Sequence, residues 1–590
     1  MLVSWYPWRE KMENGFVRSD NLLKKKLIQY LLPTLASNAA LSLTDFLDSM
    51  VVSNLLGSKA LAVINLGMPL MLVYASVYCL LGNGAATVYA VFLGKRDHDG
   101  AGKSMTISMF MALTVGLFIG VMGFVFFKPV CSVLCRDEEL LPLFIPYLRV
   151  VLLSAPFLTT ILTLTTLLPS AGYPGYSMVA TIVANIVNFT MNIVFIRVLN
   201  MGVAGAAWAT LAGYLTGLLI LAFLAVRKKI RLYISSKIKE SFKLLKVVVK
   251  QGGPEAMTQV GFALQFAFCN GVASALAGTA GVVAISLCLQ ANSLESIFLG
   301  SIMGSSVPIM SLLHGQRDYN GQTSILKTSL KWQISLAAVL STLFVIFAPQ
   351  VAALFNITDP YEISVTVKAL RIYCLMLFLR SGIILYFRYL KVAGFSGYAI
   401  LLSALDSFIA MVPVQWIMSR LFGITGLWWA FPTTAVVLLI FILIRNRYIV
   451  SHSDGHYKGL LLCENDESST PVMDVTIMDN PDSISGISEK MQQICETNGI
   501  DRKNAILAAL AVEEMAVYIT RKKDHNSYMD IMVRLYKGKV VIDFRSLGRP
   551  FNPLLDTEED NWENVDVLRG IASEIVTEYT LGMNSTRIVI

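Results

Sequence analysis

Residues 27–444 consist of long apolar stretches separated by short polar segments. Stretches of about 20 apolar residues are long enough to cross the ~30 Å hydrocarbon core of a bilayer as helices. Helices also satisfy their own backbone hydrogen bonds in lipid, and these stretches lack the alternating pattern of barrel strands. The pattern predicts an all-α membrane part with twelve transmembrane helices, near residues 27–50, 62–90, 104–127, 143–168, 176–199, 203–226, 246–271, 282–312, 331–355, 365–390, 397–419 and 423–444.

Residues 33–430 contain the same pattern twice, at a nearly constant offset of 221. The landmarks that recur are Pro33 as Pro254, Gly57 as Gly278, Gly94-Lys95-Arg96-Asp97 as Gly315-Gln316-Arg317-Asp318, Gly202 and Gly205 as Gly423 and Gly426, and, at 222, Ala171-Gly172 as Ala393-Gly394. This period is far longer than a solenoid unit, so each copy is expected to be a whole six-helix bundle. Six is an even number, so the two copies are expected to be parallel repeats, an arrangement that many transporters use.

The repeat and the change in composition after it divide the chain into six regions. These are a basic cytoplasmic arm (1–26), a first six-helix bundle (27–226), a basic cytoplasmic link (227–245), a second six-helix bundle (246–444), a linker (445–470) and a soluble α+β domain (471–590), here called the tail. Within the tail the periodicity predicts helices at 485–498, 502–520 and 564–579, and strands at 528–536, 539–545 and 585–590.

Charged residues are scarce and unevenly distributed. Only 15% of the 590 residues are charged, whereas a soluble protein carries about a quarter. Lys and Arg concentrate in the arm, in residues 227–250 and in both Gly-x-Arg-Asp turns, which all fall on one side of the predicted helices. Positive residues favour the cytoplasmic side, so we expect a multi-pass protein of the cell membrane with both termini cytoplasmic. The apolar run after Lys26 is too long for a cleavable signal peptide.

The net charge of +8 combines +14 for residues 1–470 and −6 for residues 471–590. Anionic lipid headgroups account for the basic excess, so membrane lipids are expected partners and nucleic acid is not. The eight cysteines show no metal-ligand spacing. We therefore expect no metal beyond a possible Na⁺.

Carboxylates in the first predicted span are candidate functional groups. Asp48 lies there, and Asp45 lies nearly one turn before it, so that both can share a helix face. A carboxylate at membrane depth costs about 2.5–3.5 kcal/mol on insertion scales and marks a functional site by default. The alternative is that both residues lie near the outer interface and are simply solvated.

The fifth predicted span contains three amides in an otherwise apolar helix. Asn188 and Asn192 are four residues apart and share one face, with Asn185 close by. Their carbonyl oxygens could coordinate a cation, or the amides could bind a polar solute. Interhelical hydrogen bonding, worth about 0.6 kcal/mol per pair, is an equally good explanation.

The second bundle offers weaker candidates. Glu255 and Glu295 could bind a coupling cation, but either could instead pair with Arg380 or lie in a cytoplasmic vestibule. Pro33 and Pro254 each fall early in a predicted helix, where the missing backbone donor permits a kink. We expect these two prolines to act as hinges or packing kinks.

The membrane part resembles the multidrug and toxic compound extrusion (MATE) family over about 27–445. The matching residues are Asp48, Leu55-Leu56-Gly57, Ala60-Leu61-Ala62, Asn65, Pro69 and Gly94-Lys95-Arg96-Asp97 to Ala101. The resemblance implies a twelve-helix antiporter that alternates access and exchanges an organic solute for inward H⁺ or Na⁺. It also implies a cation site in the first bundle, at the positions occupied here by Asp48, Asn188, Asn192 and Thr210. The family commonly has Asp where this chain has Asn192, so one carboxylate remains, which favours protons over Na⁺.

The tail resembles the Bergerat-type ATP-binding fold of histidine kinases and anti-sigma-factor kinases. The matching segments are Val512-Glu513-Glu514, Gly548-Arg549-Pro550-Phe551-Asn552-Pro553 and Tyr579 to Asn584. However, Tyr518 replaces the Asn that binds Mg²⁺ in that family, and Ser546 replaces the Asp that reads adenine. The glycine-rich lid is replaced by Asn564 to Gly570. We therefore expect a degenerate, non-catalytic tail that binds no nucleotide and serves as a structural, regulatory or partner-binding module.

Together these features predict a transporter rather than an enzyme, with no cofactor other than H⁺ or Na⁺ as coupling ion. The leading hypothesis is a cation-coupled antiporter that exports small organic, cationic or amphipathic solutes and carries a cytoplasmic tail that regulates it or binds a protein partner. One alternative is a membrane sensor whose tail switches a partner. Another is an exporter of a lipid-linked or polysaccharide precursor.

Overall fold

The computed structural model describes residues 18–56, 60, 63–64, 66–135, 140–227, 238–354, 359–464, 471–478, 481–521, 528–536, 539–555 and 562–590. The first bundle comprises α2 (Asn21–Leu56), α4 (Met68–Tyr78), η1 (Cys79–Asn83), α5 (Gly84–Gly94), α6 (His98–Val125), α7 (Phe127–Leu134), α8 (Leu141–Leu167), α9 (Pro174–Ile193), η2 (Val194–Val198) and α10 (Gly202–Arg227). The second comprises α11 (Ile238–Gly315), α12 (Tyr319–Ile346), α13 (Ala348–Leu354), α14 (Pro360–Val392), α15 (Ser396–Ala404), η3 (Leu405–Ile409) and α16 (Met411–Ser451).

Long apolar helices dominate the membrane part. In the part of the chain that the structure describes, nine helices are long and apolar enough to cross a membrane. Two of them, Lys239–Gly315 and Ser396–Ser451, have 77 and 56 residues, more than a single crossing needs. Each contains a residue with left-handed backbone, Gly278 (φ 58°) and Gly423 (φ 60°), at which two helices meet. The expectation of a mostly helical membrane part is confirmed.

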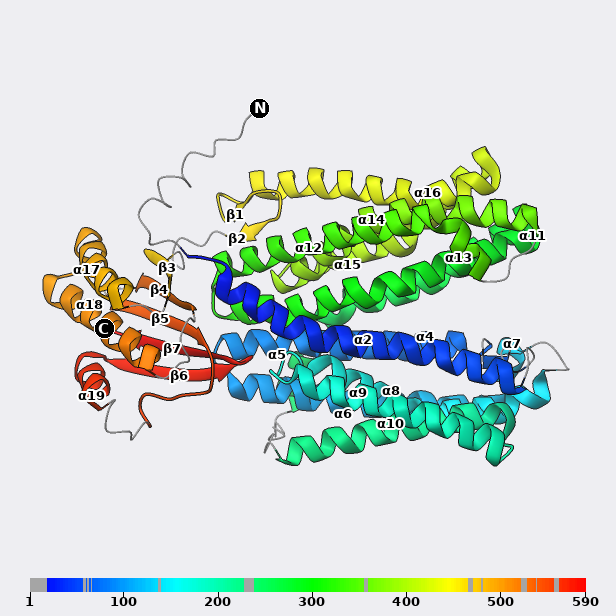
Figure 1. Cartoon of the computed structure of the whole chain (residues 1–590), viewed down its shortest axis with the longest axis horizontal. Coiled ribbons are helices and arrows are strands. Elements are labelled where there is room, and N and C mark those ends of the chain that lie inside the picture. Colours follow the sequence, from blue (N-terminus) through cyan, green and yellow to red (C-terminus); the bar gives the residue numbers. More distant parts are fainter. Residues whose placement is uncertain are drawn as a thin grey trace.

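The two bundles lie side by side with their helices nearly parallel, and the tail caps one end of the pair (Figure 1). The first bundle, blue to cyan in Figure 1, packs against the second, green to yellow, mainly through α2 and α5 on one side and α11 on the other. Both duplicated turns, 94–97 and 315–318, lie at the end that faces the tail, which we call the tail-side end.

Backbone conformation repeats along the chain at the offset seen in the sequence. Gly202 and Gly423 share a φ near 60°, at 58° and 60°. Arg96 and Arg317 are also left-handed, with φ of 62° and 57°, a conformation that residues other than glycine rarely adopt. The two copies therefore share local geometry as well as landmarks.

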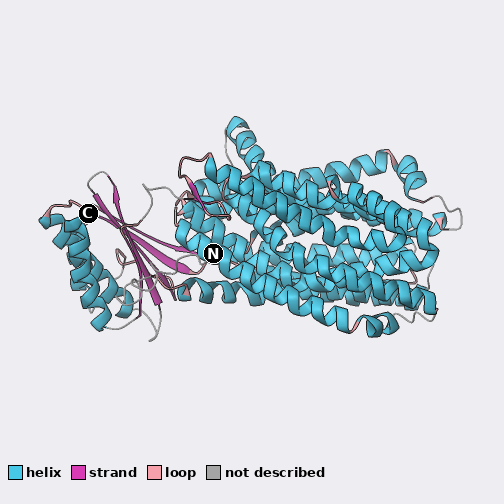
Figure 2. Cartoon of the chain, turned by 90° about the horizontal axis from the view of Figure 1, so that it is seen from above, coloured by secondary structure: helices cyan, strands magenta, loops and turns pink. Residues whose placement is uncertain are grey.

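The tail is a two-layer α+β unit. Its elements are β3 (Met473–Met478), α17 (Pro481–Thr497), α18 (Arg502–Arg521), β4 (Tyr528–Tyr536), β5 (Lys539–Leu547), α19 (Trp562–Ile571), β6 (Glu574–Thr580) and β7 (Met583–Val589). All strand pairs are antiparallel, in the order β3-β4-β5-β7-β6. The helices cover the sheet face that points away from the bundles, so the sheet lies between its helices and the membrane part (Figure 2).

Two details of the predicted tail are wrong. The segment 564–579 was expected to be one helix, but α19 ends at Ile571 and residues 574–580 form β6. Pairing with β7, for example Ile575 with Ile588, stabilises the strand and overrides the helical periodicity. The edge strand β3 was not predicted, because six residues next to a polar segment give little periodic signal.

Residues 445–464, the first part of the predicted linker, form regular structure instead. α16 continues to Ser451, and a short hairpin of β1 (Tyr457–Lys458) and β2 (Cys463–Glu464) follows. Asn446 donates to the carbonyl of Leu460 at 2.7 Å, and Tyr389 donates to that of Leu462 at 3.4 Å. Leu462 is fully buried against the second bundle. Residues up to 464 are thus packed on the membrane part, and 465–470 lie outside the described residues.

Candidate functional site

Four predicted residues of the first bundle form one continuous chain of side-chain contacts. Asn192 on α9 donates to Asp48 Oδ1 on α2 at 2.7 Å, and the same amide nitrogen is 3.3 Å from Asn188 Oδ1. Asn188 in turn donates to Thr210 Oγ1 on α10 at 3.0 Å. The spacing of four residues on α9 is what allows one helix to bridge α2 and α10.

This cluster has an unsatisfied acceptor. Asn188 and Asn192 are buried and Asp48 is half-buried. Among the residues that the structure describes, Asn192 Oδ1 is a buried oxygen without a hydrogen-bond partner. One carboxylate with amide and hydroxyl oxygens around it can hold a proton or a small hard cation, which prefers oxygen ligands. Among the described residues, no group of three or more His, Cys, Asp or Glu side chains could hold a metal ion.

Of the two remaining first-bundle candidates, one has a side chain outside the described residues and the other does not join this chain. The side chain of Asp45 lies outside the described residues, so its place is not defined. Asn185 is on α9 one turn before Asn188, and its Nδ2 is buried with no partner among the described residues.

The acidic candidates of the second bundle lie in two separate places. Glu255 accepts a hydrogen bond from the fully buried Lys391, and Arg388 is 3.9 Å away. Glu295 is buried, and its Oε1 is without a partner among the described residues. It lines a cavity with Gln333 and Arg380.

Arg380 pairs with neither glutamate. Its guanidinium binds both oxygens of the buried Asp406 carboxylate, Oδ2 through Nη2 at 2.6 Å and Oδ1 through Nε at 3.1 Å. The pair joins α14 to η3, and a bidentate pair of this kind has a fixed orientation. Of the alternatives left open for Glu255, pairing with Arg380 is not what the structure shows, because its ion-pair partner is Lys391.

A second cavity in the same bundle is largely apolar. Its walls include Phe262, Phe266, Tyr373, Trp428 and Phe431, with one amide from Gln265. Aromatic walls around a few polar groups are typical of pockets that bind small organic molecules.

The two candidate hinges have the same local structure. The carbonyl of Pro33 accepts a hydrogen bond from Ser37 at 3.0 Å, and that of Pro254 accepts one from Thr258 at 2.9 Å. Ser37 and Thr258 are related by the same 221-residue offset. Hydroxyl groups bonded in this way to a carbonyl four residues earlier often bend helices.

In the tail, the two positions that depart from the residues expected by the ATP-binding resemblance are both buried. Tyr518 is fully buried, and its ring meets that of Phe551 edge-on with centroids 5.6 Å apart. Ser546 is also buried. Residues that would face a ligand are here part of the tail's interior.

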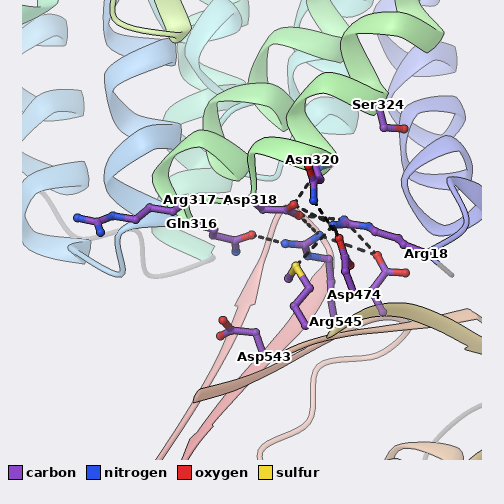
Figure 3. Close-up of polar contacts among 12 residues, drawn as sticks. Arg18, Gln316, Arg317, Asp318, Asn320, Ser324, Asp474, Asp543 and Arg545 are labelled. Carbon is purple, nitrogen blue, oxygen red and sulfur yellow. Dashed lines mark hydrogen bonds and ion pairs between the residues drawn. The ribbon is translucent and has the colours of Figure 1, made fainter. Parts of the chain in front are cut away.

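A cluster that the sequence did not predict joins the tail to the membrane part (Figure 3). Asp318 on the second duplicated turn lies between Arg18 and Arg545, with nitrogen–oxygen distances of 2.8 Å to each. Asp474 and Asp530 of the tail are 3.4 and 3.5 Å from Arg18. The alternation of charged and apolar residues on β4 and β5 indicates that the charged side chains lie on the sheet face away from the tail's core. It does not indicate which residues they contact.

The pKa values of these buried carboxylates shift in opposite directions. Burial opposes ionisation of Asp318, but Arg18 and Arg545 hold its pKa well below the usual range. Burial raises the pKa of Asp474 and of Asp530, and the arginines only partly offset that effect. Asp318 is therefore the fixed negative charge of the cluster.

Comparisons with known proteins agree with this architecture. Residues 33–194 match the MatE family model. The multidrug export protein MepA of Staphylococcus haemolyticus is 22% identical over 450 residues, which cover 75% of this chain and 98% of that protein. The probable multidrug resistance protein YpnP of Bacillus subtilis is 28% identical over 208 residues, 35% of this chain and 46% of its own length.

Solved structures share the fold. An outward-facing multidrug resistance MATE family transporter of the MOP superfamily superimposes with a TM-score of 0.66 at 23% identity, covering 73% of this chain and 96% of that one. A MOP superfamily transporter from Pyrococcus furiosus, described as having a binding pocket of reverse polarity, gives the same TM-score at 22% identity, again covering 73% and 96%. The membrane part therefore has the MATE fold, and these relatives are transporters, not enzymes. The Bergerat resemblance of the tail stays a prediction.

Proposed function

We propose that this protein is a cation-coupled antiporter that exports small organic solutes by alternating access, with H⁺ as its coupling ion. The observation that carries the proposal is the contact chain from Asp48 through Asn192 and Asn188 to Thr210. It joins three helices of the first bundle around a single carboxylate. A group that binds a cation at such a junction couples ion binding to helix packing.

The choice of H⁺ rests on the number of charges. Among the described side chains Asp48 is the one carboxylate of the contact chain, and Asn192 contributes an amide where the MATE family commonly has Asp. A Na⁺ ion loses most of its hydration on binding and needs negative ligands to replace it. A proton needs only one carboxylate oxygen.

The substrate class is supported by the aromatic cavity and by the named relatives, which are multidrug export proteins. A cavity lined by aromatic residues suits amphipathic or cationic molecules with apolar bodies. In this proposal Pro33 and Pro254 act as hinges, and Glu255 and Glu295 as secondary sites within the second bundle.

The proposed topology has twelve spans and a cytoplasmic tail. Dividing the two longest helices at Gly278 and Gly423, and counting α2 with the rest, gives twelve crossings. The described part of the basic arm, with Arg18 and Lys24 to Lys26, and both Gly-x-Arg-Asp turns lie at the tail-side end, so the excess of positive residues supports its placement in the cytoplasm. The tail regulates transport and does not bind ATP, which the packing of Tyr518 supports.

Transport in sealed vesicles tests the proposal. An imposed proton gradient should drive movement of a cationic dye, a Na⁺ gradient should not, and Asp48→Asn should abolish the movement. Asp359→Asn removes an exposed carboxylate at the start of α14 and is the matched control. The proposal fails if neither gradient moves any cationic dye and Asp48→Asn changes nothing.

A further inference from the structure

The face of the tail's sheet that points toward the bundles is charged and yet buried. Side chains alternate along a strand, so the residues between the core positions of β4 and β5 must project away from the tail's helices. These include Asp530, Asp543 and Arg545, with exposures of 0%, 5% and 2%. Charged groups are buried only where they are paired, so this face is built to be covered by a partner with matching charges.

The partner is the tail-side end of the same chain, and it includes both copies of the duplicated turn. Asp97 and Asp318 cap the helices that follow the turns, since each accepts from a backbone N–H, of Gly100 at 2.7 Å and of Gly321 at 2.9 Å. The two turns also touch each other. A Cβ on Gly94 would be 2.8 Å from the Cα of Gly315, and the reverse distance is the same. Only glycine permits such close contact between the bundles.

One strand reaches both turns. Arg545 on β5 binds Asp318 at 2.8 Å and Gln316 at 2.6 Å, both in the second turn. Asp543, two residues earlier on the same face, is 3.8 Å from Arg96 of the first turn. A residue pair on a rigid strand therefore connects the first bundle to the second.

Two other strands of the sheet, β6 and β4, add contacts to the turns. Glu578 on β6 is 3.9 Å from Arg96 and 3.1 Å from His98, at the first turn and the helix after it. Arg534 on β4 donates to the backbone carbonyl of Arg317 at 3.4 Å. Asp543 and Glu578 thus meet Arg96 at the first turn, and Arg534 and Arg545 meet the second, where Arg18 contacts the tail's Asp474 and Asp530.

The described part of the arm binds both the second turn and the tail. Arg18 binds both oxygens of Asp318, at 2.8 and 2.9 Å. Its backbone N–H donates to Asp474 O at 3.1 Å, and that of Ser19 donates to Thr476 Oγ1 at 2.9 Å. Asp318 is therefore held by the tail and by the start of the chain at once.

An apolar contact completes the interface. Leu547, Leu581 and Met583, at the sheet's end nearest the bundles, are buried in one cluster with Leu22 and Leu23 of α2. Burial of these side chains gives the docked tail a hydrophobic contribution in addition to the ion pairs.

We propose that the tail is a brace that holds the two bundles together at the tail-side end, and that this end opens only when the docking face releases at least one of the two turns. Alternating access separates the two bundles at each end in turn, and a rigid strand bound to both turns opposes that separation. The effect of the brace on transport rests on the proposed function. The brace itself concerns the distance between the two bundles and can be tested without transport.

Pulsed electron–electron double resonance on the full chain in lipid measures that distance. Spin labels on a genetically encoded amino acid avoid the eight native cysteines. A pair at Asp99 on α6 and Lys327 on α12, both exposed, reports the separation of the bundles. A second pair, at Asp99 and the exposed Glu489 on α17, reports whether the tail is docked.

Arg96→Glu places a carboxylate against Asp543 and Glu578 and should release the first turn. Both label pairs should then shift to longer distances in most molecules. Glu578→Lys in the same chain restores an opposite pair and should return both distances toward those of the unmodified protein, which a merely misfolded variant could not do. Arg502→Glu, an exposed change on the helical layer, is the matched control and should leave both distances unchanged.

Two outcomes would overturn the brace. In one, the distance between the labels at Asp99 and Glu489 increases while the distance between those at Asp99 and Lys327 stays short, so that the bundles hold together without the tail. In the other, neither pair responds to Arg96→Glu. Because no transport is measured, either result leaves the antiporter proposal standing, and a failed transport assay leaves the brace standing.

Discussion

Arg545 and Asp318, 227 residues apart in the chain, form a buried ion pair with Nη1 and Oδ2 at 2.8 Å. Both side chains are 2% exposed. Arg545 belongs to the tail and Asp318 to a turn between two membrane helices. The pair makes the tail part of one structural unit with the bundles.

Arg545→Ala should weaken that unit. Removal of one partner from a buried ion pair typically costs about 3–5 kcal/mol because the remaining charge is left uncompensated. Arg18 still contacts Asp318, so we expect a loss near the lower end, about 3 kcal/mol. Scanning calorimetry of the purified chain should show a lower unfolding temperature for the tail, and Arg502→Ala should show no change. An unaltered transition in Arg545→Ala would contradict the account.

Lys26→Met should have the opposite effect. Burial lowers the pKa of Lys26 to about 8 from the usual value of 10.5, and Gly582 of the docked tail lies against its ammonium group. Below pH 8 Lys26 is charged whether the tail is docked or released. Docking then bears the full cost of burying that charge, at most roughly 3 kcal/mol. This cost disappears as pH rises from 8 to 10.5.

The unmodified protein should therefore dock its tail more firmly as pH rises through that window, and Lys26→Met should dock firmly at neutral pH with no such dependence. The distance between labels at Asp99 and Glu489 measures docking directly. Lys25→Met removes an exposed neighbouring charge and is the control. Looser docking in Lys26→Met at pH 7 would show that the ammonium group contributes a favourable contact instead.

Asn192→Asp should create a Na⁺ site. The variant places a second carboxylate oxygen about where Asn192 Nδ2 now lies 2.7 Å from Asp48 Oδ1. Two carboxylates at that distance must share a proton or bind a cation. Ligand binding stabilises the folded state by mass action, so the variant's unfolding temperature should rise with NaCl but not with choline chloride. The unmodified protein and Asn185→Asp should respond equally to both salts, and a Na⁺-specific shift in the unmodified protein would argue against proton coupling.

The tail should not bind ATP. Tyr518, at the position where the resemblance to ATP-binding domains expects a Mg²⁺-binding Asn, is buried and packs against Phe551. A fluorescent ATP analogue titrated onto the full chain with Mg²⁺ should give no saturable signal. Saturable binding at micromolar concentration that competes with ATP would show that the site has survived the loss of its usual residues.

Much of the candidate site could be predicted from helix periodicity. The four-residue spacing of Asn188 and Asn192 fixed their common face, and the depth of Asp48 placed it in the membrane. Their contact with each other, and with Thr210, needed the resemblance as well, because spacing within one helix does not say which helices are its neighbours. The structure brings all four together.

The tail's docking could not be predicted, for a physical reason. Alternation on β5 shows that Asp543 and Arg545 leave the tail's core, and such residues ordinarily face water. Only the three-dimensional arrangement shows that the duplicated turns cover them. Lys391 was missed as the partner of Glu255 for the same reason, since ion pairs between distant helices leave no periodic signal.

The most direct test of the central claim is proton release on solute binding. A cationic dye added to the detergent-purified protein in weakly buffered solution should displace the proton held by Asp48, because the two ligands oppose each other's binding. The account predicts about one proton released per dye bound, and none from Asp48→Asn even where that variant still binds dye. Dye binding without proton release in the unmodified protein, or equal release from Asp48→Asn, would contradict it.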